Sequence, residues 1–192
     1  MALRVKTAWF RKEAGARPPA EVATVLASTI WRLADDAVSA LSRADYDILT
    51  AARGVQVMGE MIAFLAHMAD RMVHGRVPEP ERAALLQATG TRLGELVAEN
   101  VRALTGDDGF DYRANFIDFL NRRGADYATF AFEPARPSFA VMRYLGLAIR
   151  ARMTAPDRHW VADQVMELTA PEALGTLKRT VDGFYPAAGA GT

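Results

Sequence analysis

Apolar residues return every three or four positions along most of this chain, and this spacing constrains the fold more than any other feature. It is clear over residues 22–40 and again over residues 58–72. Because three to four residues make about one turn of an α-helix, such residues form one stripe on a helix. These spacings outnumber alternations of apolar and polar residues, which would indicate strands. The sequence therefore predicts an all-α fold, a bundle of six to seven helices.

Proline, glycine and capping residues divide this pattern into separate helices. Four are expected in the first two thirds of the chain, at residues 18–42, 46–74, 80–106 and 111–123. The connection between the first two is so short that it predicts a long antiparallel helical hairpin. Gly124 is expected to end the fourth helix.

The last third of the chain carries three candidate helix starts. Ser138 is predicted to cap a helix that extends to about residue 153, and the segments TAPD and TAPE begin at Thr154 and Thr169. Each threonine is followed three residues later by an acid, which is the spacing of a capping box. Thr169 is therefore expected to cap the final helix. Residues 126–137 follow no clear pattern and are left irregular.

Length and these patterns predict one helical domain over residues 18–185. A chain of 192 residues is long enough to bury a sizeable core as one domain. Residues 1–17 are predicted to form a basic arm before the domain, and residues 186–192 a flexible tail.

Composition excludes several classes of function. The chain has no cysteine, which rules out disulfides, thiol nucleophiles and thiolate metal sites. Its 23 basic residues balance 23 acidic ones, so nucleic acid is not expected as a partner. There is no apolar run of about 20 residues and no signal-peptide pattern, which predicts a cytoplasmic protein without a membrane span. Arginine outnumbers lysine by twenty to three, as in proteins of GC-rich bacteria.

Glu60, His67 and His74 are spaced by seven residues, and on a helix they share one stripe. Most apolar residues of this segment fall on the opposite side, so the stripe is predicted to be a solvated or interfacial polar face. His67 and His74 lie about 10.5 Å apart along the axis, too far for one ion to bind both. Asp70 could form half of a metal site with either histidine, completed by a second helix or a second subunit. No intrinsic metal or other cofactor is expected.

Aromatic residues concentrate between residues 110 and 144. This stretch holds nine of the seventeen aromatics, namely Phe110, Tyr112, Phe116, Phe119, Tyr127, Phe130, Phe132, Phe139 and Tyr144. Such rings build a local core, a partner surface or a small-molecule cavity, and the sequence leaves all three open. If a cavity exists, its polar contacts are expected from Tyr112, Tyr127, Arg122 or Arg123.

The helix predicted at residues 138–153 carries apolar or aromatic side chains on two sides, and one neighbouring element cannot bury both. Its apolar residues occupy one side, while Tyr144 and Leu147 lie well around the cylinder, with Arg143 and Arg150 nearer Leu147. Tyrosine, leucine and arginine are typical of interface hot spots. The sequence therefore predicts a homo-oligomer, formed through this helix or through the long hairpin.

Standard catalytic and nucleotide-binding motifs are missing from the sequence. Residue types that suit interfaces are plentiful, which favours a noncatalytic protein-binding or assembly module. The alternative is a small-molecule-binding sensor or enzyme with an aromatic pocket near residues 110–144, so enzymatic activity is left open.

Overall fold

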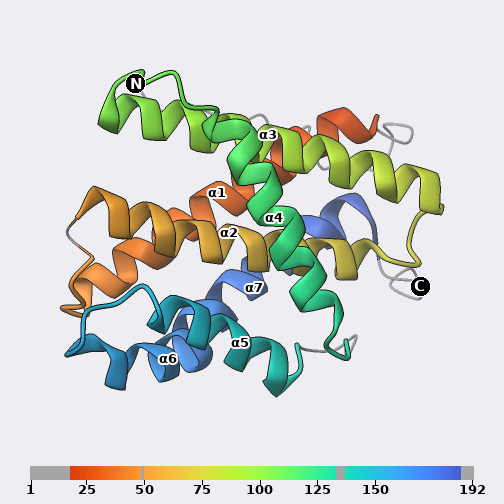
Figure 1. Ribbon diagram of the computed structural model, residues 1–192. Coiled ribbons are helices and arrows are strands. Elements are labelled where there is room, and N and C mark those ends of the chain that lie inside the picture. The colour runs from red at the N-terminus through yellow and green to blue at the C-terminus, as the bar shows by residue number, and fades with distance from the viewer. Residues whose placement is uncertain (1–17, 49, 133–136, 187–192) are drawn as a thin grey trace, which may run out of the picture.

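The computed structural model describes residues 18–48, 50–132 and 137–186 and is all-helical in this part of the chain (Figure 1). The helices are α1 (Pro19–Arg43), α2 (Ala51–Val73), α3 (Glu79–Thr105), α4 (Tyr112–Ala128), α5 (Phe139–Arg150), α6 (Val161–Gln164) and α7 (Ala170–Phe184). The described residues form no strand, only an isolated bridge between Phe132 and Pro137. The predicted all-α bundle is therefore confirmed. The predicted arm at residues 1–17 lies outside the described residues, and so does the tail from residue 187.

Helix α2 is at the centre of the bundle. It contacts α1, α3, α4, α5 and α7, and Figure 1 shows it crossing the middle of the molecule with these helices around it. Its fully buried large side chains are Met61, Ile62, Phe64, Leu65 and Met68. Burial of each such side chain contributes about 1.5 to 3 kcal/mol, so α2 supplies much of the core. The four methionines of this segment are among the core or partly buried side chains. The long antiparallel hairpin of α1 and α2 stays a prediction.

The start of α2 differs from the expected one. The helix begins at Ala51, five residues after the predicted position, and the Thr50 hydroxyl caps it by accepting a hydrogen bond from the Arg53 N–H at 3.3 Å. The preceding residues are held outside the helix by tertiary contacts. Asp47 N–H donates to the Asp157 carboxylate at 2.9 Å, and Arg53 donates to the Asp47 carbonyl at 2.7 Å.

The predicted end of the fourth helix is wrong. Helix α4 continues through Gly124 and ends at Ala128, because Tyr127 is completely buried by neighbouring helices. A glycine inside a helix costs about 1 kcal/mol, which burial of one aromatic ring exceeds. The predicted cap at Ser138 does form, since the Ser138 hydroxyl accepts from the Val141 N–H at 3.4 Å.

The predicted cap at Thr169 is also wrong. Thr169 is already helical, with φ −64° and ψ −49°, and its hydroxyl donates to the Gln164 carbonyl at 3.4 Å. A π-helical turn, Val165–Thr169, joins α6 to α7 without a break. This wider turn ends two residues before Pro171, whose ring would otherwise clash with the carbonyl four residues earlier.

The TAPD segment does not form a capping box either. The Thr154 hydroxyl donates to the Asp157 carboxylate at 2.9 Å, and a short 3₁₀ turn follows at Asp157–His159. The same carboxylate oxygen accepts from Asp47 N–H, so Asp157 joins the loop before α2 to the segment after α5.

Two glycines of α3 provide a test of how closely α4 packs. A Cβ at Gly94 would lie 3.1 Å from Ile117 Cγ1 and 3.4 Å from the Arg113 carbonyl, whereas a Cβ at Gly90 would meet nothing within 4 Å. We expect Gly90→Ala to raise the free energy of unfolding by about 0.5 to 1 kcal/mol, through helix propensity alone. Gly94→Ala is expected to cancel that gain or to destabilise. Urea denaturation of both variants measures the difference, and equal stabilisation would contradict the close packing of α3 and α4.

Candidate functional site

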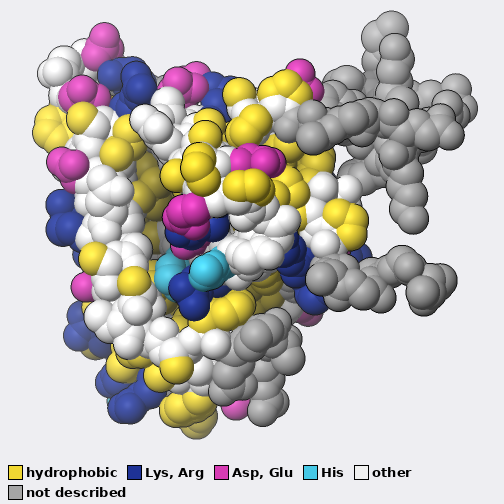
Figure 2. Space-filling view, turned by 90° about the vertical axis from the view of Figure 1, so that its right-hand side faces the viewer, with side chains coloured by type: hydrophobic (Ala, Val, Ile, Leu, Met, Phe, Trp, Pro, Cys, Tyr) yellow, Lys and Arg dark blue, Asp and Glu magenta, His cyan; other side chains and the backbone are white. Residues whose placement is uncertain are grey.

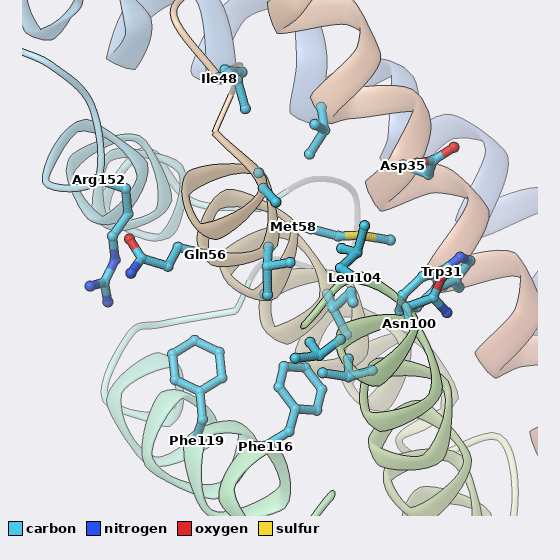
Figure 3. A pocket seen from close by; sticks show the side chains of 18 of the residues that line it. Trp31, Asp35, Ile48, Gln56, Met58, Asn100, Leu104, Phe116, Phe119 and Arg152 are labelled. Carbon is cyan, nitrogen blue, oxygen red and sulfur yellow. The ribbon is translucent and has the colours of Figure 1, made fainter. Parts of the chain in front are cut away.

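An apolar cavity of about 470 Å³ opens between α1, α2, α3 and α4 (Figure 3). We call it the aromatic cavity. Its large apolar lining residues are Trp31, Val38, Ile48, Val55, Met58, Ile62, Val97, Val101, Leu104, Phe116 and Phe119. Its volume falls within the range of about 300 to 1,000 Å³ that is typical of small-molecule sites.

Two rings of α4 form one wall of the aromatic cavity. Phe116 and Phe119 stack with their centroids 5.7 Å apart, and the sequence places them one turn apart on the same helix face. Gly59 of α2 lies directly beneath them, where a Cβ would be 3.6 Å from each ring. The small residue therefore lets α4 lie close to α2 while the rings remain at the cavity.

The two ends of the aromatic cavity differ in polarity. Figure 3 shows Arg152 beside Gln56 at one end, with Trp31, Asp35 and Asn100 at the other. Arg122 also lines this cavity. The lining is therefore mainly apolar, with arginines near one end and an aspartate at the other.

A smaller polar cleft of about 390 Å³ adjoins the arginine end of the aromatic cavity, and we call it the arginine cleft. The two share Phe119, Arg122 and Arg152 as lining residues. Arg123 and Asp126 of α4 complete the polar lining of the arginine cleft. Three guanidinium groups therefore surround it.

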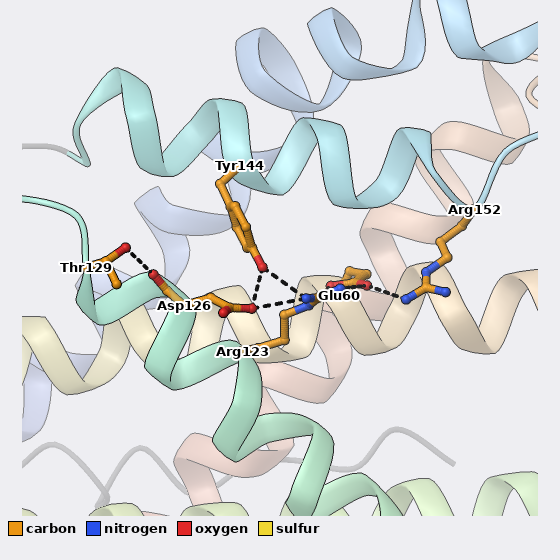
Figure 4. A network of polar contacts seen from close by, with 6 residues as sticks. All are labelled: Glu60, Arg123, Asp126, Thr129, Tyr144 and Arg152. Atoms are coloured by element: carbon orange, nitrogen blue, oxygen red, sulfur yellow. Dashed lines mark hydrogen bonds and ion pairs between the residues drawn. The ribbon is translucent and has the colours of Figure 1, made fainter.

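A buried carboxylate fixes two of these guanidinium groups (Figure 4). Glu60 of α2 is 0% exposed. Arg123 of α4 donates to both of its oxygens, from Nε and Nη2, at 2.7 Å each. Arg152, just after α5, donates from Nη2 to Glu60 Oε1 at 3.0 Å. One carboxylate thus joins three segments of the chain, and the bidentate geometry orients the Arg123 guanidinium.

A second carboxylate and a phenol hold the remaining side of Arg123. Its Nη1 donates to Asp126 at 3.2 Å and to the Tyr144 hydroxyl at 2.9 Å, and that hydroxyl donates to Asp126 at 2.5 Å. The hydrogen bond from Tyr144, together with Arg123, lowers the pKa of Asp126. Burial, and then the hydrogen bond to Asp126, raises the pKa of Tyr144 to about 12. At neutral pH the aspartate is ionised and the phenol keeps its proton, so the network is suited to holding charges in place.

The predicted polar face of α2 is buried at Glu60, half-buried at His67 and exposed at His74, so the expectation of a solvated or interfacial stripe is wrong at Glu60. Helices α4 and α5 pack against α2 there, so Glu60 lies inside the protein and the His67 ring stacks on Tyr127 with centroids 5.3 Å apart. Burial lowers the pKa of His67. A face opposite the main apolar stripe can be covered because α2 contacts helices on several sides. Figure 2 shows a face of the molecule where histidine, basic and acidic side chains lie together.

Asp70 and His67, two of the three groups that could form half of a metal site, have other partners. Asp70 forms an ion pair with Arg82 of α3, and His67 packs on an aromatic ring. Within residues 18–48, 50–132 and 137–186, no three histidine, aspartate or glutamate side chains gather closely enough to hold a metal ion.

Several predicted site residues meet at the cavities and others do not. Phe116, Phe119 and Arg122 line the aromatic cavity, and Arg123 lines the arginine cleft. Tyr144 contacts Arg123 and Asp126 within the fold, so it does not belong to the outer face of α5 where the sequence placed it.

Tyr112 and Tyr127 were predicted as polar contacts of a pocket, and neither lines the aromatic cavity. The Tyr112 hydroxyl donates to the exposed Asp108 at 2.7 Å. Tyr127 packs among Phe64, His67 and Tyr144 in the core, where burial raises the pKa of its phenol. Its hydroxyl has no hydrogen-bond partner among the described residues. Tyr127 lies on the part of α4 that continues past Gly124, and it faces the core.

Arg143, Leu147 and Arg150 lie together on the outer side of α5. They line a shallow groove of about 380 Å³ between α5 and the segment at residues 158–167, and we call it the α5 groove. Leu147 is 42% exposed and Phe139, at the same groove, is 72% exposed.

Sequence reasoning missed Glu60, Arg152, Trp31 and Met58 as parts of the site. One signal was present for Glu60, because no basic residue lies three or four positions from it on the same helix. An apolar helix that carries such an unpaired carboxylate must satisfy it from another element if it is buried. Nothing in the sequence indicated that this element is the turn after α5.

Comparison with known protein families, with curated proteins and with solved structures finds no match to this chain. None of the described helices has the length and apolar character needed to cross a membrane.

Replacement of the buried carboxylate tests its structural role. Glu60→Gln leaves two guanidinium groups without their shared counter-charge, so we expect the free energy of unfolding to fall by about 3 kcal/mol. This is the lower part of the range for buried pairs, because the two arginine side chains are 21% and 35% exposed. Glu95→Gln, which breaks a half-exposed pair with Arg92, is the control and is expected to cost less than about 0.5 kcal/mol. Equal losses in chemical denaturation would contradict the special position of Glu60.

Proposed function

We propose that this protein binds a small, largely apolar molecule in the aromatic cavity. The observation that carries the proposal is the cavity itself, which is open to solvent, about 470 Å³ in volume and lined by the Phe116 and Phe119 rings. An apolar surface that remains accessible in a folded protein is costly unless something covers it, and a concave one suits a small ligand. This is the small-molecule alternative of the sequence analysis, at a site that only partly coincides with residues 110–144.

The construction of the walls supports a preformed site. Helix α2 is fixed by contacts on several sides, and α4 is attached to it through Glu60 and Arg123. A cavity between elements held in this way needs little rearrangement to accept a ligand, which reduces the entropic cost of binding. We propose that the role of the protein is to bind and release this ligand.

A neutral dye and a cavity-filling variant test this proposal. N-phenyl-1-naphthylamine, whose fluorescence rises in apolar surroundings, is expected to bind saturably and one-to-one. Gly54 lines the aromatic cavity, and a Cβ there would meet only Ile48 within 4 Å, so the larger side chain in Gly54→Leu has space to enter. We expect this variant to weaken dye binding by about tenfold or more, with circular dichroism unchanged.

The matched control is Gly90→Leu, another glycine to leucine change in a helix. Gly90 lies on α3, does not line the aromatic cavity, and has nothing within 4 Å of an added Cβ. Its dye affinity is expected to equal that of the wild type. Wild-type protein that fails to bind the dye, or binding unaffected by Gly54→Leu, would refute the proposed site.

A second proposal concerns assembly into a homodimer through the α5 groove. It is supported by two exposed apolar side chains, Phe139 and Leu147, in a groove that carries charges of both signs. Arg143, Arg150 and Arg158 lie there with Asp163 and Glu167. Such a mixed surface can pair with a second copy of itself about a two-fold axis, with two of its three arginines meeting the two acids of the partner copy.

Sedimentation mass tests the homodimer. The wild type at micromolar concentration is expected to sediment near twice the chain mass of 21.0 kDa, and Leu147→Asp is expected to shift it toward one chain with helicity intact. Leu104→Asp is the control, because Leu104 is 61% exposed but lies on α3. A monomeric wild type would end this proposal without affecting the ligand site.

A further inference from the structure

We propose that the ligand is an amphiphilic anion, whose carboxylate or phosphate head is held by Arg122 and Arg152 while its apolar part occupies the aromatic cavity. This inference rests on the proposed ligand-binding function and adds the chemical class of the ligand. It depends on the position of the two cavities side by side, since Arg122, Arg152 and Phe119 line both of them.

The charges around the arginine cleft do not balance. Three guanidinium groups, those of Arg122, Arg123 and Arg152, face two carboxylates, those of Glu60 and Asp126. All three nitrogen atoms of Arg123 donate to Glu60, Asp126 or Tyr144. Arg123 is therefore satisfied within the fold, and the surplus positive charge belongs to the other two arginines.

Arg152 has unused donors. Among the described residues only its Nη2 has an acceptor, Glu60 Oε1 at 3.0 Å, and this oxygen is shared with Arg123. Its Nε is buried and has no acceptor in the described part of the chain. A guanidinium with five N–H groups and one hydrogen bond to a shared carboxylate retains most of its capacity for an anion.

Arg122 is the second guanidinium with unused donors. It lies one turn after Phe119 on α4, it lines both cavities, and no carboxylate of the described residues pairs with it. It is exposed, so it contributes both donors and an attractive field at the cavity entrance. Arginine forks match the paired oxygens of carboxylate and phosphate groups.

The negative charge at the opposite end of the aromatic cavity predicts the orientation of the bound ligand. Asp35 lies there, near Trp31 and Asn100, and its negative charge opposes an anionic head at that end (Figure 3). The apolar wall of Phe116 and Phe119 lies between the two ends. A single-headed amphiphile is therefore expected to bind with its anion toward Arg152 and its chain toward α1 and α3.

Displacement of the neutral dye by matched ten-carbon compounds tests the inference. Decanoate and decyl phosphate carry the two kinds of anionic head, and decan-1-ol has the same chain without charge. We expect Arg122→Gln to raise the concentrations of both anions needed for half displacement by about tenfold, and that of decan-1-ol by less than about twofold. The larger change among the two anions identifies the preferred head.

Two controls accompany this measurement. Arg113→Gln removes another exposed arginine of α4 that lines neither cavity, and it is expected to change no displacement curve. Added sodium chloride is expected to weaken the anions and to leave decan-1-ol unaffected, because salt screens exposed charges. Arg152→Gln, with folding checked by circular dichroism, is expected to reproduce the selective loss seen for Arg122→Gln.

Failure of this inference can be separated from failure of the proposed function. If decan-1-ol displaces the dye but the anions depend on neither Arg122 nor Arg152, the cavity binds ligands and the anionic class is wrong. Equal weakening of all three compounds by Arg122→Gln would also overturn the anionic class. If the wild type does not bind the dye at all, both proposals fall.

Discussion

The site depends on the ion pairs that the carboxylate of Glu60, buried at the centre of the bundle, forms with two arginines. A charge removed from water in this way requires paired donors, and Arg123 and Arg152 provide them from α4 and from the turn after α5. These contacts join three parts of the chain that are far apart in sequence. They set the position of α4 over α2, and with it the wall of the aromatic cavity.

The same interaction explains why an apolar cavity and a cationic cleft adjoin. All three nitrogens of Arg123 donate hydrogen bonds within the fold. Arg152 shares one oxygen of Glu60 and keeps further N–H donors. Phe119 lies on the boundary and lines both cavities. The ion pairs of Glu60 thus hold α4 and the turn after α5 against α2. They also place the unused donors of Arg152 at one end of the aromatic cavity. That combination is the basis for the ligand class proposed above.

Contacts on several sides of α2 also explain why the prediction for its polar stripe is wrong at Glu60. On an isolated helix Glu60 and His67 lie opposite the apolar residues, which ordinarily means solvent. In the bundle α4 and α5 cover this side, so the carboxylate is paired and the histidine stacks on Tyr127. The wrong prediction at Gly124 has a related cause, because burial of Tyr127 outweighs the local preference of a glycine to end the helix. At Thr169 a π-helical turn continues the helix through a residue whose local preference is to begin one.

The sequence by itself determined the all-α class, most helix ranges and the cap at Ser138, because helical periodicity and capping are local properties of neighbouring residues. It also marked Phe116, Phe119 and Arg122 as residues worth attention, and these do meet at a cavity. Only the tertiary structure decided which face of α4 opens to a cavity and which turns Tyr127 into the core. It also decided the partners of Glu60, since Arg123 and Arg152 are 63 and 92 residues away and no local pattern links residues at such separations.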